Sequence, residues 1–232
     1  MDFLSKIKFL LKKPKVIIVT GEGRGCAREA IFQVLKPYFE IGKNILLFET
    51  DLTDYPNREK FKFLVRNSPL PILVVTQVGD IPPDKNFFAG EKEKTVEIRK
   101  LAKSLPPYGY LILNFDDETV REIKAETNLK EITFGFQEGA DFQATDIKLN
   151  PVEEFRNVAL GDKLDAAHSK FSYGVNTGTN FKINYKGNTV PLWLEKLFGK
   201  EQIYSALAGA VCGTIFDLNL VEISQALKNY HS

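Results

Sequence analysis

Short apolar runs alternate with longer segments of mixed polarity over the first half of the chain. Four runs rich in valine, isoleucine and leucine have the length and composition of buried parallel strands: residues 16–20, 44–49, 71–76 and 109–114. Apolar residues recur at helical spacing in residues 26–35, 57–66, 91–104 and 117–127. In the third of these helices we expect Val96, Leu101 and Ala102 to face the core. The repeated strand–helix order predicts a parallel sheet covered by helices and joined by right-handed crossovers.

The pattern changes near Lys130. Residues 132–136, 142–149 and 181–185 are typical of strands, with no helix between them. We expect a hairpin turn at residues 185–189, with Gly187 and Asn188 at positive φ. The tail returns to helix at 201–215 and 220–230, and its small residues at 206–213 allow close packing on a sheet. Residues 14–232 are therefore predicted to form one three-layer α/β domain, with a mostly parallel sheet and a small antiparallel β addition.

Residues 1–13 form a basic amphipathic segment ahead of this domain. Phe3, Ile7 and Leu10 or Leu11 fall at helical spacing with lysines between them, and a proline then ends the helix. Lysines interrupt the apolar residues and no small-residue cleavage site follows, so the segment is not typical of a signal peptide. We expect its apolar stripe to dock on the domain. The alternative is a helix that lies on a membrane surface.

Composition and charge exclude several classes of protein. The 232 residues include 31 Lys plus Arg and 30 Asp plus Glu, so the formal charge is +1. The chain therefore lacks the overall excess of positive charge that is typical of nucleic-acid-binding proteins. No run of about 18 apolar residues is available for a membrane span. Cys26 and Cys212 make no disulfide framework, which favours a reducing compartment, and we expect the cytoplasm. These cysteines and His168 and His231 show no zinc spacing.

A series of short motifs follows one another in a distinctive order over most of the chain. They are VTG at 19–21, VVTQVG at 74–79, LPPYG at 105–109, LNFDD at 113–117, ITFG at 132–135, ADFQATD at 140–146, FKINY at 181–185 and YSALA at 204–208. Together they resemble the central domain of the Mur ligase family, and most of all the type that adds D-alanyl-D-alanine. Members of this family are ATP-dependent enzymes that join amino acids or peptides to a cell-wall precursor. The resemblance implies a P-loop-type topology, and we expect the flanking N- and C-terminal family domains to be absent.

The glycine-rich turn at residues 21–25 stands where the family binds phosphate. Such a loop needs glycines that turn N–H groups inward, a lysine against the phosphate oxygens and a hydroxyl that holds Mg²⁺. The family pattern is Gly-x-x-Gly-Lys-Thr-Thr, whereas this chain has Gly21-Glu22-Gly23-Arg24-Gly25-Cys26-Ala27. Arg24 replaces the second glycine, Gly25 the lysine and Cys26 the first threonine, and a thiol is a poor ligand for Mg²⁺.

Two interpretations of this turn remain open. Gly21, Gly23, Arg24, Gly25 and Cys26 form either a weakened cofactor-binding site for an anion or a tight strand-to-helix turn that binds no nucleotide. A cysteine at a helix N-terminus can gain thiolate character. No base is evident near it in the sequence, so we expect Cys26 to be unreactive.

Three further positions match the family. Glu49 ends the second predicted strand, where the resemblance implies a Mg²⁺-binding glutamate, although a solvated strand end is the alternative. Asn114 and Asp117 match the family's Asn-x-Asp-Asp and are candidate nucleotide contacts. Their alternative role is to end the strand and cap the next helix.

Other catalytic positions of the family are replaced. The metal-bridging lysine corresponds to Ile98, and Lys94 and Lys100 are out of register and more typical of a solvated face. The histidine that usually follows the motif at 74–79 is missing from residues 80–83. The His-Asn pair before the small-residue helix corresponds to Glu201 and Gln202.

The motifs that specify the fold are thus retained, while the family's catalytic and cofactor-binding residues are mostly replaced. We predict a catalytically degenerate Mur ligase-like central domain, a binding or regulatory module of peptidoglycan precursor synthesis whose partner is a cell-wall ligase or another protein of that pathway. Productive binding of ATP and Mg²⁺ is not expected. One alternative is an active ATP-dependent ligase with separate partner domains, in which Gly21, Gly23 and Gly25 cradle phosphates and Glu49 holds Mg²⁺. The other is a membrane-surface protein, peripheral to the inner membrane face, that uses residues 1–13.

Overall fold

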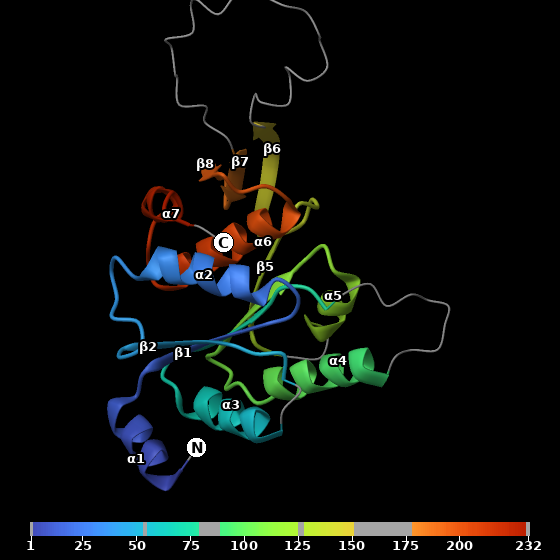
Figure 1. Ribbon diagram of the computed structural model, residues 1–232. Coiled ribbons are helices and arrows are strands. Elements are labelled where there is room, and N and C mark those ends of the chain that lie inside the picture. Colours follow the sequence, from blue (N-terminus) through green and yellow to red (C-terminus); the bar gives the residue numbers. More distant parts are fainter. Residues whose placement is uncertain (1, 53–54, 79–88, 125–127, 151–177, 231–232) are drawn as a thin grey trace, which may run out of the picture.

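The computed structural model describes residues 2–52, 55–78, 89–124, 128–150 and 178–230, and within them eight strands form one sheet (Figure 1). The strands are β1 (Lys15–Thr20), β2 (Ile45–Glu49), β3 (Pro71–Val75), β4 (Tyr110–Asn114), β5 (Lys130–Gly135), β6 (Phe142–Asn150), β7 (Gly178–Tyr185) and β8 (Asn188–Glu195). Their order in the sheet is β2-β1-β3-β4-β5-β6-β7-β8. Neighbours from β2 to β6 pair in parallel, and β7 pairs antiparallel with β6 and β8. The predicted fold class is confirmed.

Helices cover both faces of the sheet (Figure 1). One face carries α2 (Arg24–Leu35), α6 (Lys200–Ile215) and α7 (Leu220–Leu227), and the other carries α1 (Phe3–Lys12), α3 (Tyr55–Asn67), α4 (Ala89–Ala102) and α5 (Glu118–Lys124). Side chains of β1 alternate between the two layers: Ile17 and Val19 belong to the first core, Val16 and Ile18 to the second. This alternation explains why the strand is apolar throughout, because both of its faces are covered.

The small residues of α6 allow a close approach to its neighbours. A Cβ on Gly209 would lie 3.3 Å from the backbone carbonyl of Ala30 in α2, and one on Gly213 would lie 2.7 Å from the side chain of Ile223 in α7. The expected burial of this helix is confirmed. The close contacts at these two glycines are with helices α2 and α7 rather than with the sheet, which sequence spacing alone did not indicate.

Several local predictions need correction. In α4, Leu101 and Ala102 face the core as expected, but Val96 is 43% exposed, and the third core residue is Ile98, one turn before Leu101 and Ala102 on the same face. In the hairpin, Tyr185 pairs with Asn188, so positive φ falls on Lys186 and Gly187 rather than on Gly187 and Asn188.

The parallel part of the sheet extends further along the chain than the sequence pattern indicated. β5 pairs in parallel with β4 along its length, and the start of β6 is still parallel to the end of β5 through Phe134 and Phe142. Between these strands the carboxylate of Asp141 accepts hydrogen bonds from the backbone N–H and the hydroxyl of Thr133, both at 2.8 Å. The antiparallel addition therefore begins with the pairing of β6 and β7.

The N-terminal helix is present, but the docking stripe that we predicted is wrong. Phe9 is 5% exposed and packs on Phe63 of α3, with 5.8 Å between the ring centroids. The expected stripe points away from the domain, since Phe3 is 76% exposed and Leu11 80%. Among the described residues, no helix combines the length and the apolar character that crossing a membrane requires.

Candidate functional site

The turn between β1 and α2 has the tight conformation that its glycines predict. Gly21 has φ +104° and Gly23 has φ +69°, a range that residues with a Cβ rarely adopt. A Cβ on Gly21 would lie 2.6 Å from the carbonyl oxygen of Gln77 and from the hydroxyl oxygen of Thr76. The backbone N–H of Glu22 donates to that same carbonyl at 2.6 Å. The turn is therefore held against the end of β3, and only glycine fits at its first position.

Carboxylates border the turn where a phosphate-binding loop would offer its N–H groups. A Cβ on Gly23 would lie 3.0 Å from Cγ and Oε1 of Glu201, which comes from the first turn of α6. A Cβ on Gly25 would lie 3.7 Å from Oε2 of Glu49 at the end of β2. The structure thus brings Glu49 and Glu201 to the start of α2 from two different elements. Negative charge beside a helix N-terminus is favourable by itself, and the same charge opposes a second anion.

The arginines near the turn have partners within the chain. Arg24 donates from Nη1 to the carbonyl oxygen of Gly21 at 3.2 Å, so its guanidinium folds back on the loop. Arg28 lies 4.0 Å from Glu29 through Nη1 and Oε2. Neither arginine stands at the position of the family's lysine, and the charge of each is engaged with the loop or with a neighbouring glutamate.

A small hollow adjoins the turn on the side of α6. It is lined by residues from the β1–α2 turn, the segment after β3, the end of β4 and the start of α6: Glu22, Gly23, Thr76, Gln77, Asn114, Glu201, Tyr204 and Ser205. Apart from the three residues of α6, they lie at the carboxyl ends of β1, β3 and β4, the edge where ligands bind in open α/β sheets. The hollow is the candidate functional site.

Cys26 lies beside Glu201 at the start of α2 and is not activated. Burial raises the pKa of its thiol, and the neighbouring Glu201 carboxylate raises it further. On the other side, the hydroxyl of Tyr230 donates to Oε1 of Gln202 at 2.7 Å, and burial also raises the pKa of that phenol. The residues that the resemblance aligned with the family's His-Asn pair, Glu201 and Gln202, therefore do reach the turn.

Asn114 and Asp117 make the structural contacts that were the alternative to nucleotide binding. Asn114 is 1% exposed, and its Oδ1 accepts the backbone N–H of Asp116 at 3.0 Å. The carboxylate of Asp117 accepts the N–H of Val120 at 3.0 Å, at the start of α5, and the N–H of Val78 at 2.8 Å. Asp117 thus joins the loop after β3 to the first turn of α5. Asn114 also lines the hollow, whereas Asp117 does not.

Asp116 and Tyr204 form a connection that the sequence analysis missed. The carboxylate of Asp116 accepts hydrogen bonds from the Tyr204 hydroxyl at 2.9 Å and from the backbone N–H groups of Phe136 and Gln137 at 2.6 and 3.0 Å. Burial raises the pKa of Tyr204, and the adjacent carboxylate raises it further, so the phenol stays neutral and donates. A half-buried tyrosine hydroxyl needs an acceptor, and this was the signal available in the sequence.

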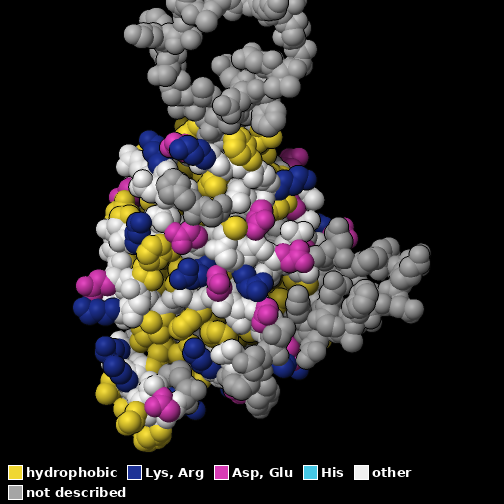
Figure 2. Space-filling model, viewed as in Figure 1, with side chains coloured by type: hydrophobic (Ala, Val, Ile, Leu, Met, Phe, Trp, Pro, Cys, Tyr) yellow, Lys and Arg dark blue, Asp and Glu magenta, His cyan; other side chains and the backbone are white. Residues whose placement is uncertain are grey.

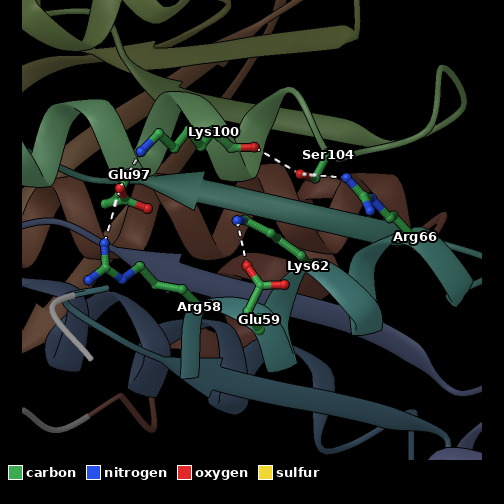
Figure 3. A network of polar contacts seen from close by, with 7 residues as sticks. All are labelled: Arg58, Glu59, Lys62, Arg66, Glu97, Lys100 and Ser104. Carbon is green, nitrogen blue, oxygen red and sulfur yellow. Dashed lines mark hydrogen bonds and ion pairs between the residues drawn. The ribbon is translucent and has the colours of Figure 1, made fainter. Parts of the chain in front are cut away.

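The helix position of the family's bridging lysine is part of the apolar core. Ile98 is 2% exposed. Lys100, two positions further along α4, is 56% exposed at its side chain and lies 2.7 Å from Oε1 of Glu97, which also lies 3.0 Å from Arg58 of α3 (Figure 3). Lys100 and then Arg58 lower the pKa of Glu97. Lys100 is exposed, as expected for a solvated face; it pairs with Glu97 within α4, and Arg58 joins the same carboxylate to α3.

The same network extends along the α3–α4 contact. Ser104 donates to the carbonyl of Lys100 at 2.9 Å and lies 3.5 Å from Nη2 of Arg66 (Figure 3). The expected solvated position of Lys94 is not tested, because its side chain lies outside what the structure describes. The same holds for residues 80–83, where the family's histidine is missing from the sequence.

The candidate site residues thus separate into two groups. Residues 21–26, Glu49 and Asn114 come together at one edge of the sheet, and Asp117 lies behind them in a structural role. Within the described residues, no three His, Cys, Asp or Glu side chains are grouped as a metal site.

The family model of the Mur ligase middle domain matches residues 87–213, more than half of the chain. This chain belongs to the Mur ligase family. The solved Mur ligases agree with the observed architecture: a MurF structure from Acinetobacter baumannii superposes with a TM-score of 0.71 and 15% identity, covering 99% of this chain and 49% of that one. MurF ligase from Thermotoga maritima in complex with ADP gives a TM-score of 0.68 at 14% identity, with 95% and 50% covered. At such identities the likeness shows the fold alone.

The curated relatives found by sequence carry a different enzyme name from these MurF structures. UDP-N-acetylmuramate--L-alanine ligase of Hydrogenobaculum sp. (strain Y04AAS1) is 29% identical over 195 residues, which cover 82% of this chain and 34% of that protein. The enzyme of the same name from Vesicomyosocius okutanii is 30% identical over 130 residues, covering 55% and 22%. The chain therefore spans about a third or less of these relatives. The predicted D-alanyl-D-alanine-adding type remains a prediction, because these relatives are named for another amino acid.

Proposed function

We propose that this chain is a catalytically degenerate Mur ligase central domain that serves as a binding or regulatory module in peptidoglycan precursor synthesis. Its partner would be a cell-wall ligase or another protein of the precursor pathway. The observation that carries the proposal is the position of Glu201, whose side chain lies against Gly23 in a turn without lysine or hydroxyl. The free cysteines Cys26 and Cys212 support a cytoplasmic location, because a reducing compartment keeps thiols free.

The residues present do not fit a magnesium–nucleotide complex. A triphosphate needs a cation at the position of Gly25, and the nearest side chain to a Cβ built there is the carboxylate of Glu49, at 3.7 Å. The hydroxyl that would hold Mg²⁺ is replaced by the Cys26 thiol, whose raised pKa keeps it protonated and a poor ligand for a hard ion. The bridging lysine is replaced by the buried Ile98.

The magnitude of these losses decides between a weak enzyme and an inactive one. Phosphoryl transfer depends almost wholly on positioning and charge stabilisation. Removing one preorganised group of this kind costs on the order of 3–4 kcal/mol, or roughly a factor of 100–1,000 in rate. Three such groups are replaced in this chain, so we expect negligible ligase turnover.

Thermal unfolding with and without Mg-ATP tests the proposal. A ligand that binds only the folded state raises the melting temperature. Because we expect no binding, Mg-ATP should leave the melting temperature of the natural chain unchanged. The matched variant is Gly25→Lys with Cys26→Thr and Glu201→Gln, which restores the cation and the hydroxyl and removes the carboxylate at Gly23. We expect that variant to gain a saturable rise. A saturable rise in the natural chain would instead favour an active ATP-dependent ligase that works with partner domains.

A further inference from the structure

The outer face of α1 is a continuous apolar surface that no described part of the chain covers. At about 3.6 residues per turn, five apolar side chains share one arc of about 120° on the side opposite Phe9. Their exposed fractions are large: Phe3 76%, Leu4 73%, Ile7 38%, Leu10 43% and Leu11 80%. Figure 2 shows these hydrophobic side chains gathered at the lower end of the molecule, over α1.

Lysines border this arc on both sides. The same helical spacing places Lys8 and Lys12 along one edge and Lys6 along the other, and all three are exposed. An apolar face with cations at both edges matches the boundary between lipid headgroups and acyl chains, where the apolar side chains insert and the lysines reach anionic phosphates.

A basic hollow next to α1 extends this complementarity. It lies between α1, β2 and α3, and its lining includes the four lysines Lys8, Lys12, Lys43 and Lys60. No acidic side chain of the described residues lines it. Lys43 is paired with Glu40 at 2.9 Å, so Lys8, Lys12 and Lys60 provide the positive charge that an anionic headgroup would meet beside the apolar arc.

The helix is fixed to the domain in the orientation that presents this arc. Phe9 is buried, and the ammonium group of Lys6 lies 5.2 Å from the ring centroid of Phe63. The Lys13 N–H donates to the carbonyl of Phe9 at 2.8 Å and ends the helix in a left-handed cap. Pro14 then leads into β1, and its carbonyl accepts the hydroxyl of Ser68 at 3.0 Å. Because the attachment uses Phe9 and the two residues before β1, the apolar arc has no role in holding the domain together.

We propose that α1 binds the surface of an anionic lipid bilayer, lying in its plane with this arc inserted. A second copy of the chain is the less suitable occupant, since the arc offers five side chains on a ten-residue helix, whereas a stable interface uses about 20–30 residues a side. The lysines on both edges would also face one another in such a dimer. The binding surface precedes β1, whereas the candidate site follows it, so the two lie at opposite edges of the sheet and the inference does not rest on the proposed function.

Co-sedimentation of the full chain with vesicles tests the proposal. We expect the chain to pellet with vesicles that contain phosphatidylglycerol, much less with phosphatidylcholine alone, and to be released by salt. Leu4→Ser with Leu11→Ser should weaken binding by at least about tenfold, and Lys8→Gln with Lys12→Gln by about tenfold or more. None of the four side chains is buried, so the melting temperature should stay unchanged.

Matched controls use exposed residues far from α1. Leu149→Ser with Val221→Ser, and Lys148→Gln with Lys228→Gln, remove the same kinds of side chain elsewhere and should leave vesicle binding as it is. Equal pelleting of the Leu4/Leu11 variant and the natural chain would overturn the proposal. So would concentration-dependent self-association that the same variant abolishes in the absence of vesicles, because that result identifies a second copy as the occupant.

Discussion

Replacing Gly21 by alanine tests how firmly the turn after β1 is built into the sheet. Gly21 has φ +104°, and an added Cβ would lie 2.6 Å from the Gln77 carbonyl oxygen, which is backbone and unable to rotate away. Strain at such a φ costs about 1–3 kcal/mol. Overpacking against fixed atoms adds about 1–3 kcal/mol. We therefore expect Gly21→Ala to lower the free energy of unfolding by about 2–6 kcal/mol, a large share of the roughly 5–15 kcal/mol of a typical domain.

Gly42 provides the matched control. Its φ is +90°, close to that of Gly21, but a Cβ there would meet no atom within 4 Å. Gly42→Ala should then cost only the backbone strain, about 1–3 kcal/mol. Urea unfolding followed by circular dichroism measures both variants, and the slope of the transition should be unchanged. If Gly21→Ala costs no more than Gly42→Ala, the turn is not held against β3 and the geometric basis of the candidate site is wrong.

Three further predictions concern single side chains. Glu97→Gln should lower the free energy of unfolding by about 1–3 kcal/mol at neutral pH, as measured by urea unfolding. Lys100 and Arg58 lower the pKa of Glu97 in the folded state. The loss of stability in the variant should therefore shrink as the pH falls through that pKa. Ile98→Ala should cost about 2–5 kcal/mol in urea unfolding, while Val96→Ala, exposed on the same helix, should cost under about 0.5 kcal/mol. Cys26 should react with iodoacetamide more slowly than a free cysteine at the same pH, because its pKa is raised. Glu201→Gln should speed the reaction, and an unchanged rate would show that the Glu201 carboxylate does not raise the pKa of Cys26.

The hydrophobic pattern predicted most of the sheet because buried parallel strands leave a simple signature. The apolar runs of β1 and β3 are covered on both faces, so each reads as continuous valine, isoleucine and leucine. Helix orientation was harder to predict. We placed Val96 of α4 in the core, whereas the buried face contains Ile98, one turn before Leu101 and Ala102.

The N-terminal helix shows the same limit more sharply. Its periodic stripe was recognised in the sequence, yet the side chain that docks is Phe9, on the opposite face. A single aromatic ring that meets Phe63 holds the helix in place, and nothing in the local spacing records the position of that partner. The domain therefore contacts the less apolar side of α1.

What the sequence determined by itself was the order of strands and helices, the tight glycine turn and the loss of its lysine and hydroxyl. These follow from residue identity and local spacing, which fix backbone preferences and the chemistry that a position can offer. Only the tertiary structure decided that Glu201 lies over Gly23, that Asp116 accepts from Tyr204, and that the apolar arc of α1 faces outward. Those contacts join residues far apart in the chain, so they depend on how whole elements pack and have no signature in any local segment.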